Sequence, residues 1–172
     1  SSWKRHDHNA MPPSAKTTGN YVNSSLAKVE ALKAGYDEAI MLNQAGLVSE
    51  CTGENIFVGR RGRLTTPPVS AGALEGITQS TVTAIAEDHG IEVVVGDLAR
   101  SDVYVADEMF VCGTAAEVSA VNSVDDRELP LFFHARTVDF QDVTVQATVT
   151  YRIVDPALAA ARIDFAIDVD TG

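Results

Sequence analysis

The chain has 172 residues, of which 45% are hydrophobic and 22% are charged, so disordered and fibrous classes are excluded. Its formal net charge is -11, and its Lys and Arg residues are scattered, which argues against nucleic acid as a partner. No apolar run reaches the ~18 residues of a membrane-spanning helix, and no apolar signal segment follows the first residues, so a cytoplasmic location is expected. Cys51 and Cys112 are expected to be free and buried.

The first fourteen residues are polar and end in two prolines and a serine, which predicts an extended lead-in. His6 and His8 within it could suggest a metal, but no Cys or further His supplies the remaining ligands, so solvated side chains are expected.

A lone lysine, Lys16, follows among small uncharged residues. A desolvated lysine amine is a nucleophile toward carbonyls, and small neighbours let a planar cofactor approach the backbone. The alternative is an ordinary solvated loop lysine.

After Tyr21, apolar residues recur at spacings of four and three, which predicts an amphipathic helix that ends at Gly35. Its inner face is expected to hold Val22, Leu26, Val29 and Leu32. Strands are expected at residues 39–42, 47–50, 55–58, 64–66, 91–95 and 108–112. The first four strands form two hairpins in this prediction, and a helical turn is expected at 101–104.

A second helix is predicted after residues 72–78, with Val82, Ile85 and Ala86 on its inner face and Gly90 at its end. Its free N–H groups would suit a phosphate, although most such helix starts hold water. The strand at 108–112 runs into residues 113–116, whose glycine, threonine and alanines offer a second anion cradle.

Glu50 and Glu54 lie four residues apart in the turn between two strands. One carboxylate could meet a ring nitrogen, and the alternative is turn chemistry. A lysine amine, a tyrosine hydroxyl, a carboxylate and two anion cradles are together what a pyridoxal phosphate site requires.

Several motifs in one order resemble the large domain of the fold-type IV aminotransferases, above all the branched-chain aminotransferases. The motifs are SSWKRH, AKTTGNYVNSSLAKVEALKAGYDEAIMLN, LVSECTGENIFV, LTTPP, LEGIT and YVADEMFVCGTAAEV. The resemblance covers residues 1 to about 128, and D-amino acid aminotransferases and aminodeoxychorismate lyases share the plan. It implies a mixed α and β fold (α+β), with a compact barrel-like sheet and helices outside.

The resemblance also implies roles for individual residues around pyridoxal 5'-phosphate. Lys16 would bond to the cofactor aldehyde and later move the proton between the substrate Cα and the cofactor. Tyr21 would hydrogen-bond the phenolic oxygen, and Glu50 would keep the pyridine nitrogen protonated. Glu54 would support the turn.

In the same way, Ile77, Thr78 and Thr114 would hold the cofactor phosphate. The amides of Thr114 and Ala115 would receive the substrate carboxylate. The substrates would be Leu, Ile or Val and 2-oxoglutarate, and a homodimer is possible.

Three departures from the family pattern predict weak or absent activity. Gln79 stands where the family usually has an arginine. The small N-terminal domain, with its phosphate-binding arginine, is absent, and the residues after Glu128 do not follow the pattern.

The tail alternates apolar and polar residues from Asp142 to Ile153, which predicts a two-faced strand, and Asp155 is expected to cap a helix. This stretch resembles the early part of an SPFH (band 7) domain. The expected domains are therefore 1–128 and 129–172, with a junction near Leu129. A hypothesis of another class is a non-catalytic assembly module whose SPFH-like strand pairs with another copy.

Overall fold

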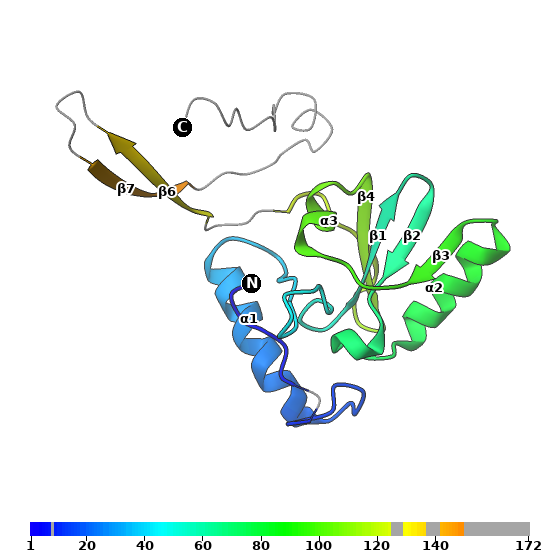
Figure 1. The fold of residues 1–172 in the computed structure, drawn as a ribbon. Helices are drawn as coiled ribbons and strands as arrows, with labels where there is room; N and C mark the ends of the chain where they lie inside the picture. The colour runs from blue at the N-terminus through cyan, green and yellow to red at the C-terminus, as the bar shows by residue number, and fades with distance from the viewer. Residues whose placement is uncertain (8, 125–128, 137–141, 150–172) are drawn as a thin grey trace. The chain divides into compact units, whose positions relative to one another are not determined.

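The computed structural model describes residues 1–7, 9–124, 129–136 and 142–149 (Figure 1). Ser1–Asn122 forms one compact unit, and a second unit lies within Ser123–Asp155. The domain boundary expected at residue 128 lies outside the described residues.

The first unit is a mixed α and β structure, as the sequence predicts. Its helices are α1 (Tyr21–Lys33), α2 (Ile77–Asp88) and α3 (Arg100–Tyr104), with short 3-10 helices at Thr18–Asn20 and Val69–Ala71. Its strands are β1 (Asn55–Arg60), β2 (Arg63–Thr66), β3 (Glu92–Val95), β4 (Glu108–Gly113) and β5 (Glu117–Ala120).

The five strands form one sheet in the order β3-β2-β1-β4-β5. β1 is antiparallel to β2 and β4, whereas β2 and β3 are parallel because α2 connects them. The two-residue turn between β1 and β2 consists of Arg61 and Gly62, both with positive φ (52° and 76°). That conformation matches the twist of a tight hairpin, which confirms the predicted pairing.

The core of the sheet is centred on Phe57, which is fully buried and stacks on Phe110 with ring centroids 4.9 Å apart. Ala86 and Val82 of α2 pack against this cluster together with Leu64. Figure 1 shows α2 beside the sheet, next to β3. The predicted inner face of α2 is therefore correct for Val82 and Ala86 and wrong for Ile85, which is 55% exposed.

The predicted inner face of α1 is wrong. Its four large apolar residues are about half exposed or more, and they are Val22, Leu26, Val29 and Leu32. The buried face consists of Ser24, Ala27 and Ala31, which pack against Ala39 and Met41. Small side chains let a helix approach its neighbour closely, and here the small stripe of α1 packs against Ala39 and Met41.

The hairpin predicted at 39–42 and 47–50 is present only in part. Met41 N–H donates to Glu50 O (2.9 Å) and Ser49 N–H to Met41 O (2.9 Å), yet no regular strand is formed. The reason is that the same segments also pair elsewhere: Leu42 bridges Lys4, and Val48 N–H donates to the carbonyl of Leu98 (2.8 Å).

The second unit is a two-stranded antiparallel sheet of β6 (Leu129–Arg136) and β7 (Asp142–Val149). β7 confirms the described part of the predicted alternating strand. β6 was not expected, because the prediction placed a junction there. The predicted strand residues 150–153 and the helix from Asp155 lie outside the described residues.

Cys51 and Cys112 are both free and buried, as predicted. Within the described part of the chain, no helix is long and apolar enough to cross a membrane.

The inward face of α1 can be tested by a pair of neighbouring substitutions. Ala27→Leu should lower the free energy of unfolding by ~1–3 kcal/mol, because Ala27 has 0% exposure and a larger side chain would overpack its buried cluster. Leu26→Gln, at a position that is 46% exposed, should change it by less than about 0.5 kcal/mol. Urea unfolding of both variants measures the difference, and the reverse ranking would contradict the assignment.

Candidate active site

A pocket in the first unit brings together residues that are far apart in the sequence. Its lining includes Arg5, Lys16, Asn20, Tyr21, Glu50 and Asn55. The pocket holds about 360 Å³ of empty space, counting its open mouth. The lining combines an amine, a hydroxyl and a carboxylate, which are the polar groups that a small-molecule site uses to orient its ligand.

The loop that carries Lys16 is held by Asn20, the residue just before α1. Asn20 is 4% exposed, and its Nδ2 donates to Pro12 O (3.0 Å) and Ala15 O (2.5 Å). These bonds fix the backbone on the N-terminal side of Lys16, while the 3-10 turn at 18–20 fixes the other side. Lys16 itself is exposed, so the desolvation expected for it is not provided by the described residues.

Tyr21 is the first residue of α1 and is partly buried against the same pocket. Because Asn20 and Tyr21 are consecutive, the start of α1 positions both the lysine loop and the tyrosine ring. The predicted grouping of Lys16, Tyr21 and Glu50 is thus present as one wall of a pocket.

Glu50 is 5% exposed and accepts hydrogen bonds on both carboxylate oxygens. Oε1 accepts from Arg5 Nη2 (2.5 Å), and Oε2 accepts from the Leu74 backbone N–H (2.9 Å) and more weakly from Asn55 Nδ2 (3.4 Å). Burial raises the pKa of Glu50, and the Arg5 charge and the Leu74 N–H oppose this, leaving the pKa above its ordinary value.

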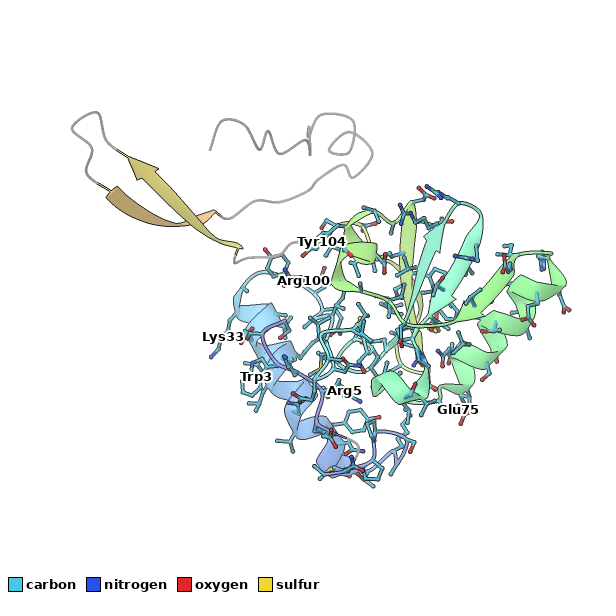
Figure 2. The ribbon with its side chains drawn as sticks, viewed as in Figure 1. Trp3, Arg5, Lys33, Glu75, Arg100 and Tyr104 are labelled. Carbon is cyan, nitrogen blue, oxygen red and sulfur yellow. The ribbon has the colours of Figure 1, made fainter. Side chains whose placement is uncertain are left out.

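The sequence analysis did not single out Arg5, which is labelled in Figure 2. It lies in the lead-in that was expected to be merely extended and polar, yet it is 5% exposed. The lead-in pairs with the core through Arg5 N–H and Leu42 O (2.9 Å). The available signal was its position within the SSWKRH motif, which gave no indication of a partner.

Asn55 connects the pocket to the start of α2. Its Nδ2 donates to Leu74 O (2.8 Å), and a Cβ placed on Gly76 would collide with its Oδ1. Glycine is therefore required at position 76 for the segment before α2 to approach the pocket wall.

Gln79, which departs from the family pattern, has a structural role. Its Oε1 accepts weakly from Gly76 N–H (3.4 Å), and its Nε2 donates to Thr66 Oγ1 (2.8 Å). Thr66 is 1% exposed and in turn donates to Ile56 O (2.8 Å). Gln79 thus attaches the first turn of α2 to β2.

The four residues expected to hold phosphate and carboxylate groups do not line the pocket. Ile77 is 76% exposed at the start of α2, and Thr78 is partly buried. Thr114 and Ala115 are exposed in the turn between β4 and β5. Both anion cradles begin next to residues that line the pocket. Gly76, before the first cradle, abuts Asn55, and a Cβ built on Gly113, before the second, would lie 3.4 Å from the carbonyl oxygen of Gly53.

Two neighbouring carboxyl groups, those of Glu38 and Glu54, lie at the turn at 50–55. Glu38 accepts from Lys28 Nζ (2.5 Å) and Thr52 Oγ1 (2.5 Å), and these partners lower its pKa against the effect of burial. Burial and the neighbouring Glu38 raise the pKa of Glu54 to about 7. Glu54 also accepts from Gly53 N–H (3.2 Å), so its contacts are made within and beside the turn.

The model of the family "Amino-transferase class IV" matches residues 1–124. The chain belongs to the class IV aminotransferases. The match ends at residue 124, before β6 and β7, and the SPFH-like resemblance of the tail stays a prediction.

Relatives and solved structures agree with this membership. A protein of Aquifex aeolicus named a probable branched-chain-amino-acid aminotransferase is 49% identical over 130 residues, which are 75% of this chain and 42% of that protein. The branched-chain aminotransferase of Thermoproteus uzoniensis with norvaline superposes with a TM-score of 0.70 at 52% identity, over 71% of this chain and 41% of that chain.

The branched-chain amino acid aminotransferase of Thermobaculum terrenum in its PLP form superposes with a TM-score of 0.68 at 43% identity, over 71% of this chain and 40% of that chain. The chain therefore spans about two fifths of the length of the relatives that it matches.

The Glu38–Glu54 pair should make stability depend on pH. The folded chain keeps a proton on Glu54 up to about pH 7, whereas the unfolded chain releases it near 4.5, so the folded state binds more protons between these values. Stability therefore falls as the pH rises through this window. Glu54→Gln keeps a donor toward Glu38 without titrating, and we expect it to remove this loss.

Urea unfolding between about pH 5 and pH 8 measures the effect. Over this range the free energy of unfolding of wild type should fall by ~1 kcal/mol more than that of Glu54→Gln. This value is smaller than the full pKa shift of Glu54 would give, because Glu54 is about half exposed to solvent. Glu87→Gln, at an exposed position of α2, is the control and should follow wild type. Parallel curves for all three proteins would contradict the pairing.

Proposed function

We propose that this chain binds pyridoxal 5'-phosphate and forms part of the active site of a branched-chain amino acid transaminase. The reaction would exchange an amino group between Leu, Ile or Val and 2-oxoglutarate. The observation that carries this proposal is the common pocket of Lys16, Tyr21 and Glu50. The names of the relatives support the substrate class.

The chemistry of the pocket fits the cofactor. When bound, pyridoxal phosphate supplies a conjugated ring that accepts the electron pair left on the substrate Cα. Lys16 Nζ would hold the cofactor covalently and, once released, move a proton to and from that carbon. Tyr21 would donate its hydroxyl to the phenolic oxygen. Glu50 would accept the ring N–H and keep that nitrogen protonated.

The two cradles beside the pocket would complete the site. The first-turn N–H groups of α2, at Ile77 and Thr78, would bind the phosphate, and the Thr114 hydroxyl would add a donor. The amides of Thr114 and Ala115 would receive the substrate carboxylate. Ile77, Thr114 and Ala115 are exposed in this structure, and Thr78 is partly buried.

Related activities would use the same residues. D-amino acid aminotransferase or aminodeoxychorismate lyase chemistry needs the same lysine and carboxylate, and the choice among substrates depends on side-chain contacts beyond Lys16, Tyr21 and Glu50. We further propose small-molecule amino and oxo acids as partners, a cytoplasmic location and a possible homodimer. The SPFH-like assembly module stays a prediction from the tail alone.

Covalent trapping tests the cofactor proposal. Incubation with pyridoxal phosphate and reduction with borohydride should attach one cofactor at Lys16, because its loop borders the ring-binding residues. Lys16→Ala should lose this attachment, and Lys33→Ala, which changes an exposed lysine at the end of α1, should retain it. Intact-mass measurement and peptide mapping give the result. Equal labelling of Lys16→Ala and wild type would contradict the proposal.

We expect the isolated 172-residue chain to turn over substrate near background. Lys16 faces an open, solvated pocket, and open sites lose the orientation and exclusion of water on which transfer depends. Glutamate formation from leucine and 2-oxoglutarate measures turnover. Robust conversion that Lys16→Ala abolishes would overturn this expectation.

A further inference from the structure

The ion pair between Arg5 and Glu50 is buried on both sides. Each residue is 5% exposed, and Nη2 lies 2.5 Å from Oε1. Removing two charges from water costs roughly what their attraction returns, and replacing a buried pair with apolar residues is often neutral or stabilising. Stability alone therefore does not explain why this pocket contains a buried arginine.

Arg5 is fixed along its whole length. Its backbone N–H donates to Leu42 O (2.9 Å), and its backbone carbonyl accepts from Gln44 Nε2 (3.1 Å). Its Nε donates weakly to the carbonyl of Gly72 (3.4 Å), a residue with φ of 95°. The two backbone bonds fix where the Arg5 side chain begins, and the Gly72 carbonyl together with Glu50 orients its guanidinium.

The hydrogen bonds on Glu50 leave one acceptor position open. A carboxylate oxygen carries two lone pairs. Oε2 accepts from both Leu74 N–H and Asn55 Nδ2, whereas Oε1 accepts only from Arg5 among the bonds that the structure describes. The remaining capacity therefore lies on Oε1, the oxygen whose position Arg5 determines.

The charge of Arg5 also favours the ionised form of Glu50. Burial is the largest influence on the pKa of Glu50 and raises it, and the Arg5 charge is the largest influence that lowers it. Arg5 is the cation that pairs with Glu50, whereas the other ion pair of the described residues joins Lys28 and Glu38. Without Arg5, Glu50 would keep its proton to higher pH, and a neutral carboxyl attracts a cationic ring nitrogen poorly.

We propose that Arg5 is a positioning residue that holds the Glu50 carboxylate ionised and oriented, with the open position of Oε1 available to the protonated ring nitrogen of the cofactor. The identity of that cofactor rests on the proposed function. The control of Glu50 by Arg5 does not, because it follows from contacts within the chain.

The test follows the ionisation of Glu50 itself, without cofactor. The carbon-13 carboxyl signals of labelled glutamates are titrated by NMR, and Glu50→Gln identifies the Glu50 signal by its absence. Arg5→Met keeps the apolar stem and removes the charge, and it should shift the Glu50 midpoint upward by about one pH unit or more. Arg5→Lys, which keeps the charge, should leave the Glu50 midpoint close to its wild-type value.

Arg60→Met, at an exposed position of β1, is the matched control and should leave the Glu50 midpoint unchanged. An Arg5→Met variant that folds and titrates like wild type would overturn the proposal. If Arg5→Met does not fold, the double variant with Glu50→Gln decides. Recovery of folding would support an uncompensated charge as the defect, and failure of both the double variant and Arg5→Lys to fold would show that Arg5 only packs.

A second measurement separates this inference from the proposed function. Pyridoxal phosphate is titrated into wild type and Arg5→Met, and binding is measured at several pH values. Weaker binding by Arg5→Met, most marked where its Glu50 has taken up a proton, supports the positioning role. If wild type binds no cofactor while the NMR shift is present, the proposed function fails and the control of Glu50 by Arg5 stands.

Discussion

The buried ion pair of Arg5 and Glu50 is the contact on which the pocket depends. Arg5 comes from the lead-in and Glu50 from the turn before β1, 45 residues later. Through its second oxygen Glu50 binds the backbone of Leu74, and Arg5 binds that of Gly72, so the segment before α2 joins the same cluster. One charge pair thus fixes three separate stretches of chain around a site that Lys16 and Tyr21 complete. Removing either partner would leave a buried, uncompensated charge at its centre.

Local signals in the sequence predicted much of the fold. The glycine at position 62 and the apolar run 56–58 before it indicate the β1–β2 hairpin, and Gly35 and Gly90, both with positive φ, follow the ends of α1 and α2. The inner face of α1 could not be predicted in this way. A helix with both a small-residue stripe and a large apolar stripe has two candidate faces, and only the neighbour at Ala39 and Met41 shows which is buried.

The candidate site was also predicted only in part. Lys16, Tyr21 and Glu50 follow from motifs and family resemblance, and they do share a pocket. Arg5 could not be predicted because its burial comes from tertiary pairing with Leu42 and Glu50. Its neighbours in the sequence are polar, and a polar segment predicts exposed side chains. The cradle at Thr114 is recognisable as a strand end rich in small residues, but local sequence does not say whether it faces the pocket.

The most direct measurement of the central claim is a crystal structure of the chain soaked with pyridoxal phosphate. We expect density for the cofactor in the described pocket, continuous with Lys16 Nζ, with the ring nitrogen beside Glu50 Oε1 and the ion pair to Arg5 intact. A cofactor bound elsewhere, or a Glu50 side chain turned away from the ring and from Arg5, would contradict this assignment.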